Sequence, residues 1–176
     1  MFNTDKIQAG ITDEYLEMFK AWKNSPVKLL EVGYLEGEFL RWFKANFTKA
    51  EVFGIGINPP IDLSDKEIKL FQVDQNNIDG LLNFGTEHGK FNIICDDGSH
   101  KEKETRNSFN CLWQFVKPGG WYVIEDWSIH YKYFQYGERA KVIGDIMTQK
   151  IKLGINEIKI MDKAGGCSLA FFQKKL

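Results

Sequence analysis

Two kinds of hydrophobic pattern alternate along the chain. Continuous apolar runs predict buried strands, and apolar residues spaced three and four apart predict helices with one buried face. The strands are expected at 27–33, 51–57, 68–73, 91–96, 121–126, 156–161 and 167–173. The helices are expected at 13–24, 37–47, 76–89, 103–116 and 137–151.

This alternation predicts a doubly wound, Rossmann-like α/β fold with a seven-stranded, mostly parallel sheet covered by helices on both faces. The last two strands are separated only by the turn-forming segment 162–166, so we expect a C-terminal antiparallel hairpin. The chain has 176 residues, a length that suits one domain over 1–176.

Composition narrows the class of protein. Hydrophobic residues make up 43% of the chain, enough for a buried core. The net charge of -1 predicts no general attraction to nucleic acid or membranes, and the chain contains no apolar run of about 20 residues. The cysteines, three in number, lack metal-site spacing, and no signal peptide is visible. We therefore expect a cytoplasmic protein that acts on a small molecule; its oligomeric state, including a homo-oligomer, is left open.

Candidate chemistry gathers where strands end, because ligands of such sheets bind outside the carboxyl ends of the strands. Asp96 and Asp97 follow one strand, and Glu125 and Asp126 follow the next. If these strands are neighbours, about 4.8 Å apart, the carboxylates repel one another unless a divalent cation such as Mg²⁺ or Mn²⁺ joins them. His100 could take a proton in the same pocket. In the alternative, Asp96 or Asp97 caps a helix while Glu125 and Asp126 pair with lysine or arginine.

Other polar residues at the same edge suit an organic ligand. Glu31, Gly33 and Gly37 form an E-x-G-x-x-x-G pattern between a strand and a helix, which differs from the dinucleotide fingerprint and disfavours NAD. Asp74 and Gln75 could bind a ribose or a base edge. A plain strand–helix turn and a helix cap are the alternative readings of these two groups. The aromatic segment 126–137 is a candidate lid over an acceptor, or packs on the domain surface.

Several motifs occur together in a recognisable order: "TDK", "LLEVGYLEGEFLRWF", "VFGIGINP", "VDQNN", "FNIICDDGSH" and "GGWYVIEDW". Together they resemble the metal-dependent, S-adenosylmethionine-dependent sugar O-methyltransferases of the macrocin and mycinamicin type, which have the class I methyltransferase fold. The resemblance implies transfer of a methyl group to a hydroxyl of a sugar or related vicinal diol.

The resemblance also implies a role for individual residues. His100 is the expected general base, and Mg²⁺ or Mn²⁺ is expected at Asp97, Glu125 and Asp126. The residues expected to line the S-adenosyl-L-methionine site are Glu31, Gly33, Tyr34, Gly37, Asn58, Asp74, Gln75 and Asp96.

One departure from the family pattern bears on the donor site. Gly56 stands where these enzymes usually carry an acidic residue that binds the ribose, and Asn58 could reach the ribose instead. Segment 9–11 also departs from the usual pattern. The alternative function is therefore a binding or scaffold protein that keeps the methyltransferase fold with weakened catalysis.

Overall fold

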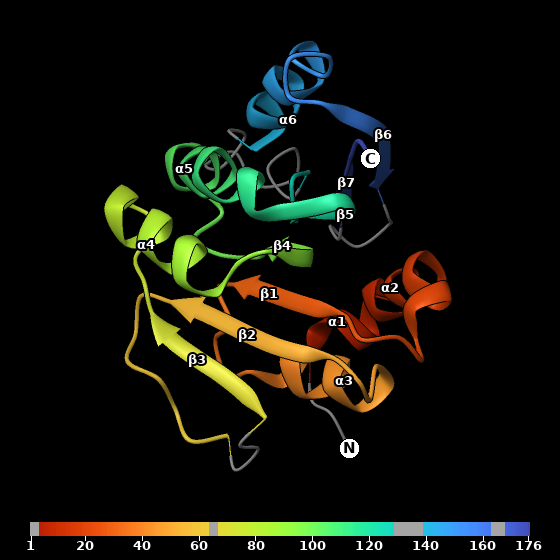
Figure 1. Cartoon of the computed structure of the whole chain (residues 1–176), viewed down its shortest axis with the longest axis vertical. Helices are drawn as coiled ribbons and strands as arrows, with labels where there is room; N and C mark the ends of the chain where they lie inside the picture. Colours follow the sequence, from red (N-terminus) through yellow and green to blue (C-terminus); the bar gives the residue numbers. More distant parts are fainter. Residues whose placement is uncertain (1–3, 64–66, 129–138, 163–167) are drawn as a thin grey trace.

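The computed structural model describes residues 4–63, 67–128, 139–162 and 168–176. Within them, strands form one seven-stranded sheet in the order β3-β2-β1-β4-β5-β7-β6 (Figure 1). The strands are β1 (Lys28–Val32), β2 (Glu51–Gly56), β3 (Ile68–Gln72), β4 (Phe91–Asp96), β5 (Val116–Glu125), β6 (Ile155–Asp162) and β7 (Ser168–Lys174).

The first five strands are parallel, while β7 is antiparallel to both β5 and β6. The predicted sheet and hairpin are therefore confirmed, with β6 at the edge. Strands β4 and β5 are neighbours, as the cation-site prediction required, and Asp96 lies opposite Ile124. The strand order reverses between β1 and β4, which places the switch point of the sheet there.

Helices cover both faces of the sheet (Figure 1). One face carries α1 (Asp5–Gln8), α2 (Ile11–Phe19), the short 3₁₀ turn η1 (Lys20–Trp22) and α3 (Glu38–Asn46). The other carries α4 (Ile78–His88), α5 (Glu102–Leu112), η2 (Trp113–Phe115) and α6 (Arg139–Thr148). Apolar side chains from both faces of the strands pack into two separate core clusters, one under each set of helices.

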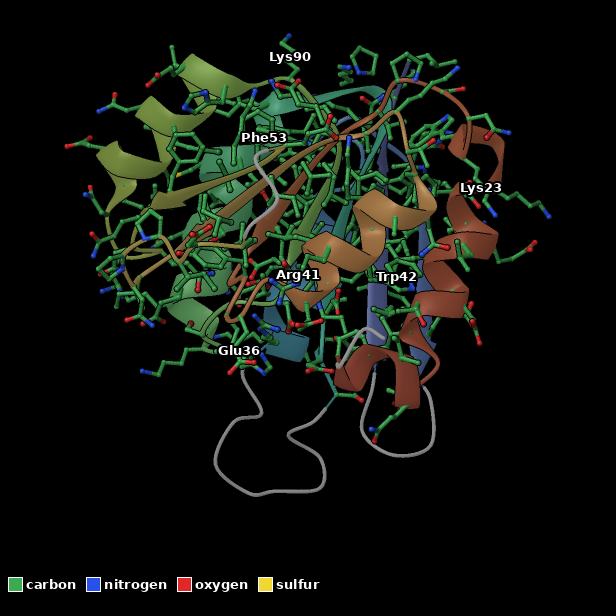
Figure 2. The ribbon with its side chains drawn as sticks, turned by 90° about the horizontal axis from the view of Figure 1, so that it is seen from below. Lys23, Glu36, Arg41, Trp42, Phe53 and Lys90 are labelled. Carbon is green, nitrogen blue, oxygen red and sulfur yellow. The ribbon has the colours of Figure 1, made fainter. Side chains whose placement is uncertain are left out.

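All the parallel strands end at one end of the molecule. Figure 2 shows Lys90, which precedes β4, at one end and Glu36, which follows β1, at the other. The loops that follow these strands can therefore build one shared site.

The structure differs from the predicted elements mainly at their boundaries. The first long helix begins at Ile11, after Gly10 in a left-handed conformation, and ends earlier than predicted. Strand β5 begins at Val116 instead of residue 121, because the glycine-containing segment continues the strand through an irregularity in its pairing with β4. The short helix α1 was not predicted. The candidate aromatic lid lies mostly outside the described residues, as do Cys167 and the hairpin turn at 163–167.

No helix in the described ranges combines the length and the apolar character that a membrane span needs.

The core around β7 gives a direct test of the fold. Phe171 is fully buried, and its ring lies 6.2 Å from the rings of both Tyr15 and Trp121. We expect Phe171→Ala to lower the free energy of unfolding by about 3–5 kcal/mol, measured by urea denaturation. The control Ile151→Ala, at a position that is 95% exposed, should change it by less than about 0.5 kcal/mol. Equal effects of the two substitutions would contradict this placement of β7.

Candidate functional site

A cavity of about 410 Å³ lies at the carboxyl ends of the parallel strands. Five of the residues predicted for the donor site line it, namely Gly33, Tyr34, Asn58, Asp74 and Gln75. Asp97, Gly98 and Ser99, from the loop after β4, line it as well. Its volume lies within the range of about 300–1,000 Å³ that is usual for small-molecule sites.

Gly33 allows the loops after β1 and β4 to touch. Its φ of +92° favours glycine, and a Cβ atom at this position would lie 2.5 Å from both the carbonyl oxygen of Asp97 and Cα of Gly98. The glycine in the E-x-G-x-x-x-G pattern therefore serves a close backbone approach at the switch point of the sheet.

Gln75, which also lines the cavity, holds the loop after β4. Its Oε1 accepts a 2.8 Å hydrogen bond from the backbone N–H of Ser99, and its Nε2 donates to Oγ of Ser108 at 2.8 Å. The amide is therefore engaged in shaping the cavity wall, and Gln75 is buried.

Tyr34 accounts for the glycine at the end of β2. A Cβ atom at Gly56 would lie 3.1 Å from Cε1 of Tyr34, so the tyrosine ring occupies the space that a side chain at this position would need. The Tyr34 hydroxyl lies 3.3 Å from the backbone carbonyls of Asn58 and Pro59, to which it donates. The departure at Gly56 is thus part of a packed arrangement.

Three residues predicted for the donor site do not line the cavity. Gly37, with φ +70°, precedes α3 and faces the side chain of Leu63. Glu31 is buried, with 2% exposure, and Asp96 is fully buried, so neither side chain lines the cavity.

Asp96 anchors a buried arginine. Its Oδ1 lies 3.3 Å from Nη2 of Arg139, and its Oδ2 accepts a hydrogen bond from the Tyr122 hydroxyl at 3.3 Å. Arg139 also donates from Nε to Oγ1 of Thr105, at 2.8 Å, and from Nη1 to the backbone carbonyl of Glu125. Asp96 therefore ties the start of α6 to the ends of β4 and β5.

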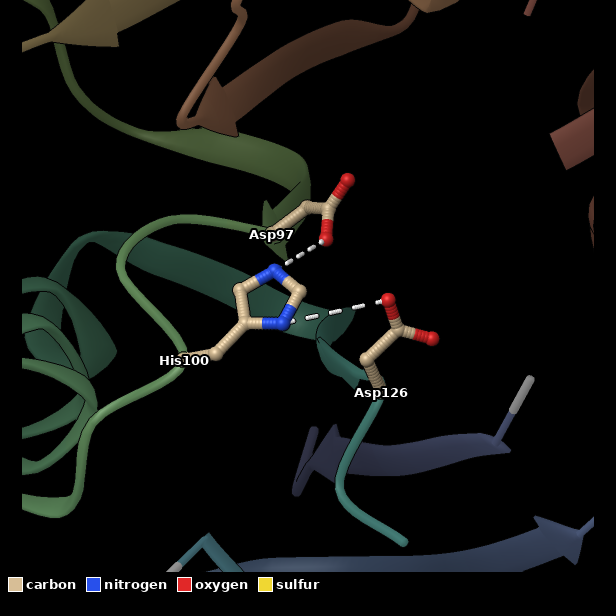
Figure 3. A group of neighbouring side chains, drawn as sticks. All are labelled: Asp97, His100 and Asp126. Atoms are coloured by element: carbon tan, nitrogen blue, oxygen red, sulfur yellow. Dashed lines mark ion pairs between the residues drawn. The ribbon is translucent and has the colours of Figure 1, made fainter. Parts of the chain in front are cut away.

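Asp97, His100 and Asp126 form a group whose potential ligand atoms all lie within 4.8 Å of one another. In Figure 3 the imidazole of His100 lies between the two carboxylates, with one ring nitrogen facing each. Its Nε2 is 3.2 Å from Oδ1 of Asp97, and its Nδ1 is 4.0 Å from Oδ2 of Asp126. His100 and Asp126 both have a positive φ, of 60° and 53°, which is uncommon for non-glycine residues. The loops hold these two side chains in a constrained backbone geometry, as functional sites often do.

The group has oxygen atoms available for a cation. Oδ1 of Asp97 and Oδ1 of Asp126 are buried and accept no hydrogen bond from the described residues. Buried polar atoms normally have a hydrogen-bond partner, whereas Oδ1 of Asp97 has only its ion pair with His100, so these two oxygens can accept a ligand. Carboxylate oxygen is the ligand type that Mg²⁺ and Mn²⁺ prefer. The residues present therefore fit a divalent cation.

Glu125, the third predicted ligand, lies outside this group. Its Oε1 accepts hydrogen bonds from Lys6, the Tyr15 hydroxyl and the Cys95 thiol, at 3.0, 2.8 and 2.7 Å. None of these three bonds uses Oε2.

Lys6 is the functional candidate that the sequence reasoning missed. It is buried at 6% exposure, and its Nζ lies 3.1 Å from Glu31, 2.9 Å from Asp97 and 3.0 Å from Glu125. The one signal in the sequence was its place in the "TDK" motif quoted for the family resemblance. No spacing rule could have found it, because its partners are far away along the chain.

No protein-family model matches the chain. Mycinamicin VI 2''-O-methyltransferase from Micromonospora griseorubida is 34% identical over 131 residues, which cover 70% of this chain and 33% of that protein. Demethylmacrocin O-methyltransferase from Streptomyces fradiae has the same identity and coverage. The chain is a homologue of these sugar O-methyltransferases. It spans about a third of the length of these curated relatives.

Solved structures agree with this relationship. The MycE methyltransferase from the mycinamycin biosynthetic pathway, in complex with Mg, SAH and mycinamycin VI, matches with a TM-score of 0.79 and 27% sequence identity. The match covers 94% of this chain and 50% of the MycE chain. The expected methyltransferase fold is therefore confirmed for this homologue.

The carboxyl groups around Lys6 and His100 differ in how readily they ionise. Burial alone would lower the pKa of Lys6, but Asp97, Glu125 and Glu31 together raise it well above its ordinary value. Burial opposes ionisation of Asp97, yet Lys6 and His100 hold the pKa of this carboxyl far below its usual range. Glu31 shares the same ammonium, but burial raises its pKa to about 7. Burial, followed by repulsion from Asp97 and Glu125, raises the pKa of Asp126 to about 7.

The raised pKa of Asp126 provides a test of whether this group binds a divalent cation. Below a pH of about 7 the carboxyl is protonated in the cation-free protein and must lose this proton before it can bind a cation. We therefore expect the affinity for Mn²⁺ to fall by up to about tenfold per pH unit below neutrality, and to level off above it. Calorimetric titration across this range measures the slope. An affinity that stays constant on both sides of neutrality would contradict the assignment.

Proposed function

We propose that the chain is the catalytic domain of an S-adenosyl-L-methionine-dependent, Mg²⁺-dependent O-methyltransferase that acts on a hydroxyl of a sugar or related vicinal diol. The observation that carries this proposal is the position of Asp97. Asp97 lines the 410 Å³ cavity and also belongs to the group with His100 and Asp126. A donor in the cavity and an acceptor bound at the Asp97, His100 and Asp126 group would therefore meet at Asp97.

The cavity supplies contacts suited to the methyl donor. Tyr34 offers an aromatic ring, while Asp74 and Asn58 offer polar groups at the rim for the ribose or the base. Because the Tyr34 ring fills the space at Gly56, the donor would contact this ring where an acidic side chain usually binds. The MycE structure is a complex with SAH, which supports a donor of this chemistry in the matching fold.

Asp97 and Asp126 would hold the cation, with Glu125 contributing through Oε2. When bound, Mg²⁺ or Mn²⁺ supplies Lewis-acid polarisation of an acceptor hydroxyl, which lowers its pKa. The two buried aspartate oxygens that accept no hydrogen bond from the described residues support this assignment. The complex of MycE with Mg supports the choice of a divalent cation of this type.

His100 would act as the general base. One of its ring nitrogens accepts the proton of the acceptor hydroxyl, and the neighbouring carboxylates of Asp97 and Asp126 stabilise the imidazolium that forms. The acceptor oxygen then forms a bond to the methyl carbon of the donor while the carbon–sulfur bond breaks. The electron pair of that bond stays on sulfur, which leaves the neutral thioether SAH. The protein contributes mainly by positioning these groups.

Gly56 favours a second candidate, a binding protein that keeps the fold without catalysis. Its missing carboxylate removes a contact to the donor. The packing of Tyr34 against Gly56 supports a retained donor cavity in either case.

Two measurements test the proposal. Calorimetry with SAH should show one binding site per chain, and transfer of a labelled methyl group to a panel of sugars should require Mg²⁺ or Mn²⁺. Absence of SAH binding at millimolar concentration would overturn both candidates. Binding of SAH without transfer to any sugar or diol would favour the binding protein.

A further inference from the structure

The ammonium of Lys6 lies where the donor side and the cation side of the site meet. It approaches Glu31 beneath the cavity, and it approaches Asp97 and Glu125 at the ends of β4 and β5. Helix α1, which carries Lys6, contributes nothing to the sheet. The lysine therefore brings a positive charge into the site from a separate element.

The environment of Nζ has the form of a cation-binding position. Three carboxylate oxygens surround it at 2.9–3.1 Å, and the ring of Phe39 faces it with a centroid distance of 4.2 Å. Lysine is rarely buried unless it is paired, and here it is paired three times. Each partner uses a single oxygen atom: Oε1 of Glu31, Oδ2 of Asp97 and Oε1 of Glu125.

The carboxylate oxygens that do not contact the Lys6 ammonium include two without a hydrogen-bond donor among the described residues. Oδ1 of Asp97 and Oε2 of Glu31 are buried and accept no hydrogen bond from the described residues. Oδ1 of Asp97 is also the atom that faces His100. The ammonium thus binds one oxygen of each carboxylate, and in Asp97 the other oxygen faces His100.

We propose that Lys6 is a resident cation: its ammonium permanently fills a second cation position next to the divalent-cation group, and it positions Glu31, Asp97 and Glu125. This inference deepens the proposed function, since it concerns the same site. Breaking a buried ion pair by removing one partner is costly, because it leaves the other charges uncompensated. A protein without this ammonium should therefore take up another cation at the same position.

Two substitutions separate the charge of Lys6 from its volume. Lys6→Ala removes the ammonium and opens space among three carboxylates, whereas Lys6→Met removes the charge and keeps most of the volume. Lys20→Ala is the matched control, because Lys20 forms an exposed ion pair with Glu17. Mn²⁺ binding is counted by electron paramagnetic resonance on each variant, and Tm is measured with and without Mn²⁺ or methylammonium.

We expect one Mn²⁺ per chain in the wild type, in Lys6→Met and in Lys20→Ala, and two in Lys6→Ala. Lys6→Ala should lower Tm by about 6 °C or more, and methylammonium or Mn²⁺ should restore a large part of this loss. Methylammonium should not restore Lys6→Met, in which the methionine side chain fills the position. A merely structural lysine would give the same loss without recovery.

Three outcomes would overturn the inference. One is a Lys6→Ala variant that binds a single Mn²⁺ more tightly than the wild type, since Lys6 would then compete for the one cation position. Another is that Mn²⁺ and methylammonium raise the Tm of Lys6→Ala no more than they raise the Tm of Lys20→Ala. If Lys6→Ala is unfolded without additives, its refolding yield is measured in place of Tm. The third outcome is a refolding yield that methylammonium does not increase. Absence of Mn²⁺ binding in the wild type would instead count against the proposed function, and the methylammonium comparison would still test Lys6.

Discussion

Replacing His100 with glutamine should lower kcat for methyl transfer by about 10²–10⁴-fold and change the affinity for SAH by less than about threefold. Glutamine keeps a polar side chain of similar size but cannot take a proton from the acceptor. SAH binding should survive, because His100 does not line the cavity. Initial rates at saturating donor, together with calorimetry on the same preparation, separate the two effects.

Saturating Mn²⁺ makes this test specific for a base, because cation binding itself depends on pH through Asp126. At a cation concentration that saturates both proteins, His100→Gln should still show the lower kcat. His88→Gln is the control, since His88 packs against Phe71 and Phe84 at the end of α4 and lies outside the site. A His100→Gln variant that keeps more than a tenth of the wild-type kcat would contradict the assignment.

Asp126→Asn should also have a large effect. We expect it to weaken cation binding and to raise the stability of the cation-free protein. Asparagine keeps the size of the side chain and tolerates the positive φ of 53° at this position, so the backbone should be unchanged. The neutral amide is a poorer ligand, and we expect the affinity for Mn²⁺ to fall by about 100-fold and transfer activity with it.

Stability without the cation should rise in the same variant. The folded protein holds the pKa of Asp126 near 7, above its usual 3.8, so ionisation of this group costs stability increasingly as the pH rises from the unfolded-state pKa to the folded one. The neutral asparagine removes that cost. We expect a Tm a few degrees higher than that of the cation-free wild type at about pH 8, and little difference at about pH 4. Asp79→Asn, on the exposed first turn of α4, is the control. A lower Tm together with unchanged Mn²⁺ affinity would contradict a cation site at Asp126.

Much of this site followed from the sequence because it depends on short-range rules. Apolar runs located the strands, and parallel strands place their carboxyl ends together, so Asp97, His100 and Asp126 could be expected at one point. The glycine pattern likewise assigned Gly33 to the same edge of the sheet, where the structure shows a close backbone approach.

Long-range partners could not be predicted in this way. Lys6 lies on a helix of four residues, too short for any periodic pattern, and Glu125 is 119 positions away along the chain. Asp96 and Asp97 are adjacent in sequence, yet one binds the buried Arg139 and the other lines the cavity. Only the fold decides which aspartate meets the arginine. Gly56 looked like a lost contact, because nothing in the sequence places the ring of Tyr34 over it.

The anchoring of Arg139 has a practical consequence for engineering. This side chain donates to the backbone carbonyl of Glu125, so the two ends of the chain between Asp126 and α6 are fixed close together beside the cation group. Loop-closure entropy grows slowly with length. We therefore expect a change of length between these two anchors to cost little closure entropy as long as the contact of Arg139 with Glu125 holds. The junction is therefore a place to vary the sequence next to the proposed acceptor side while Asp97, His100 and Asp126 stay unchanged.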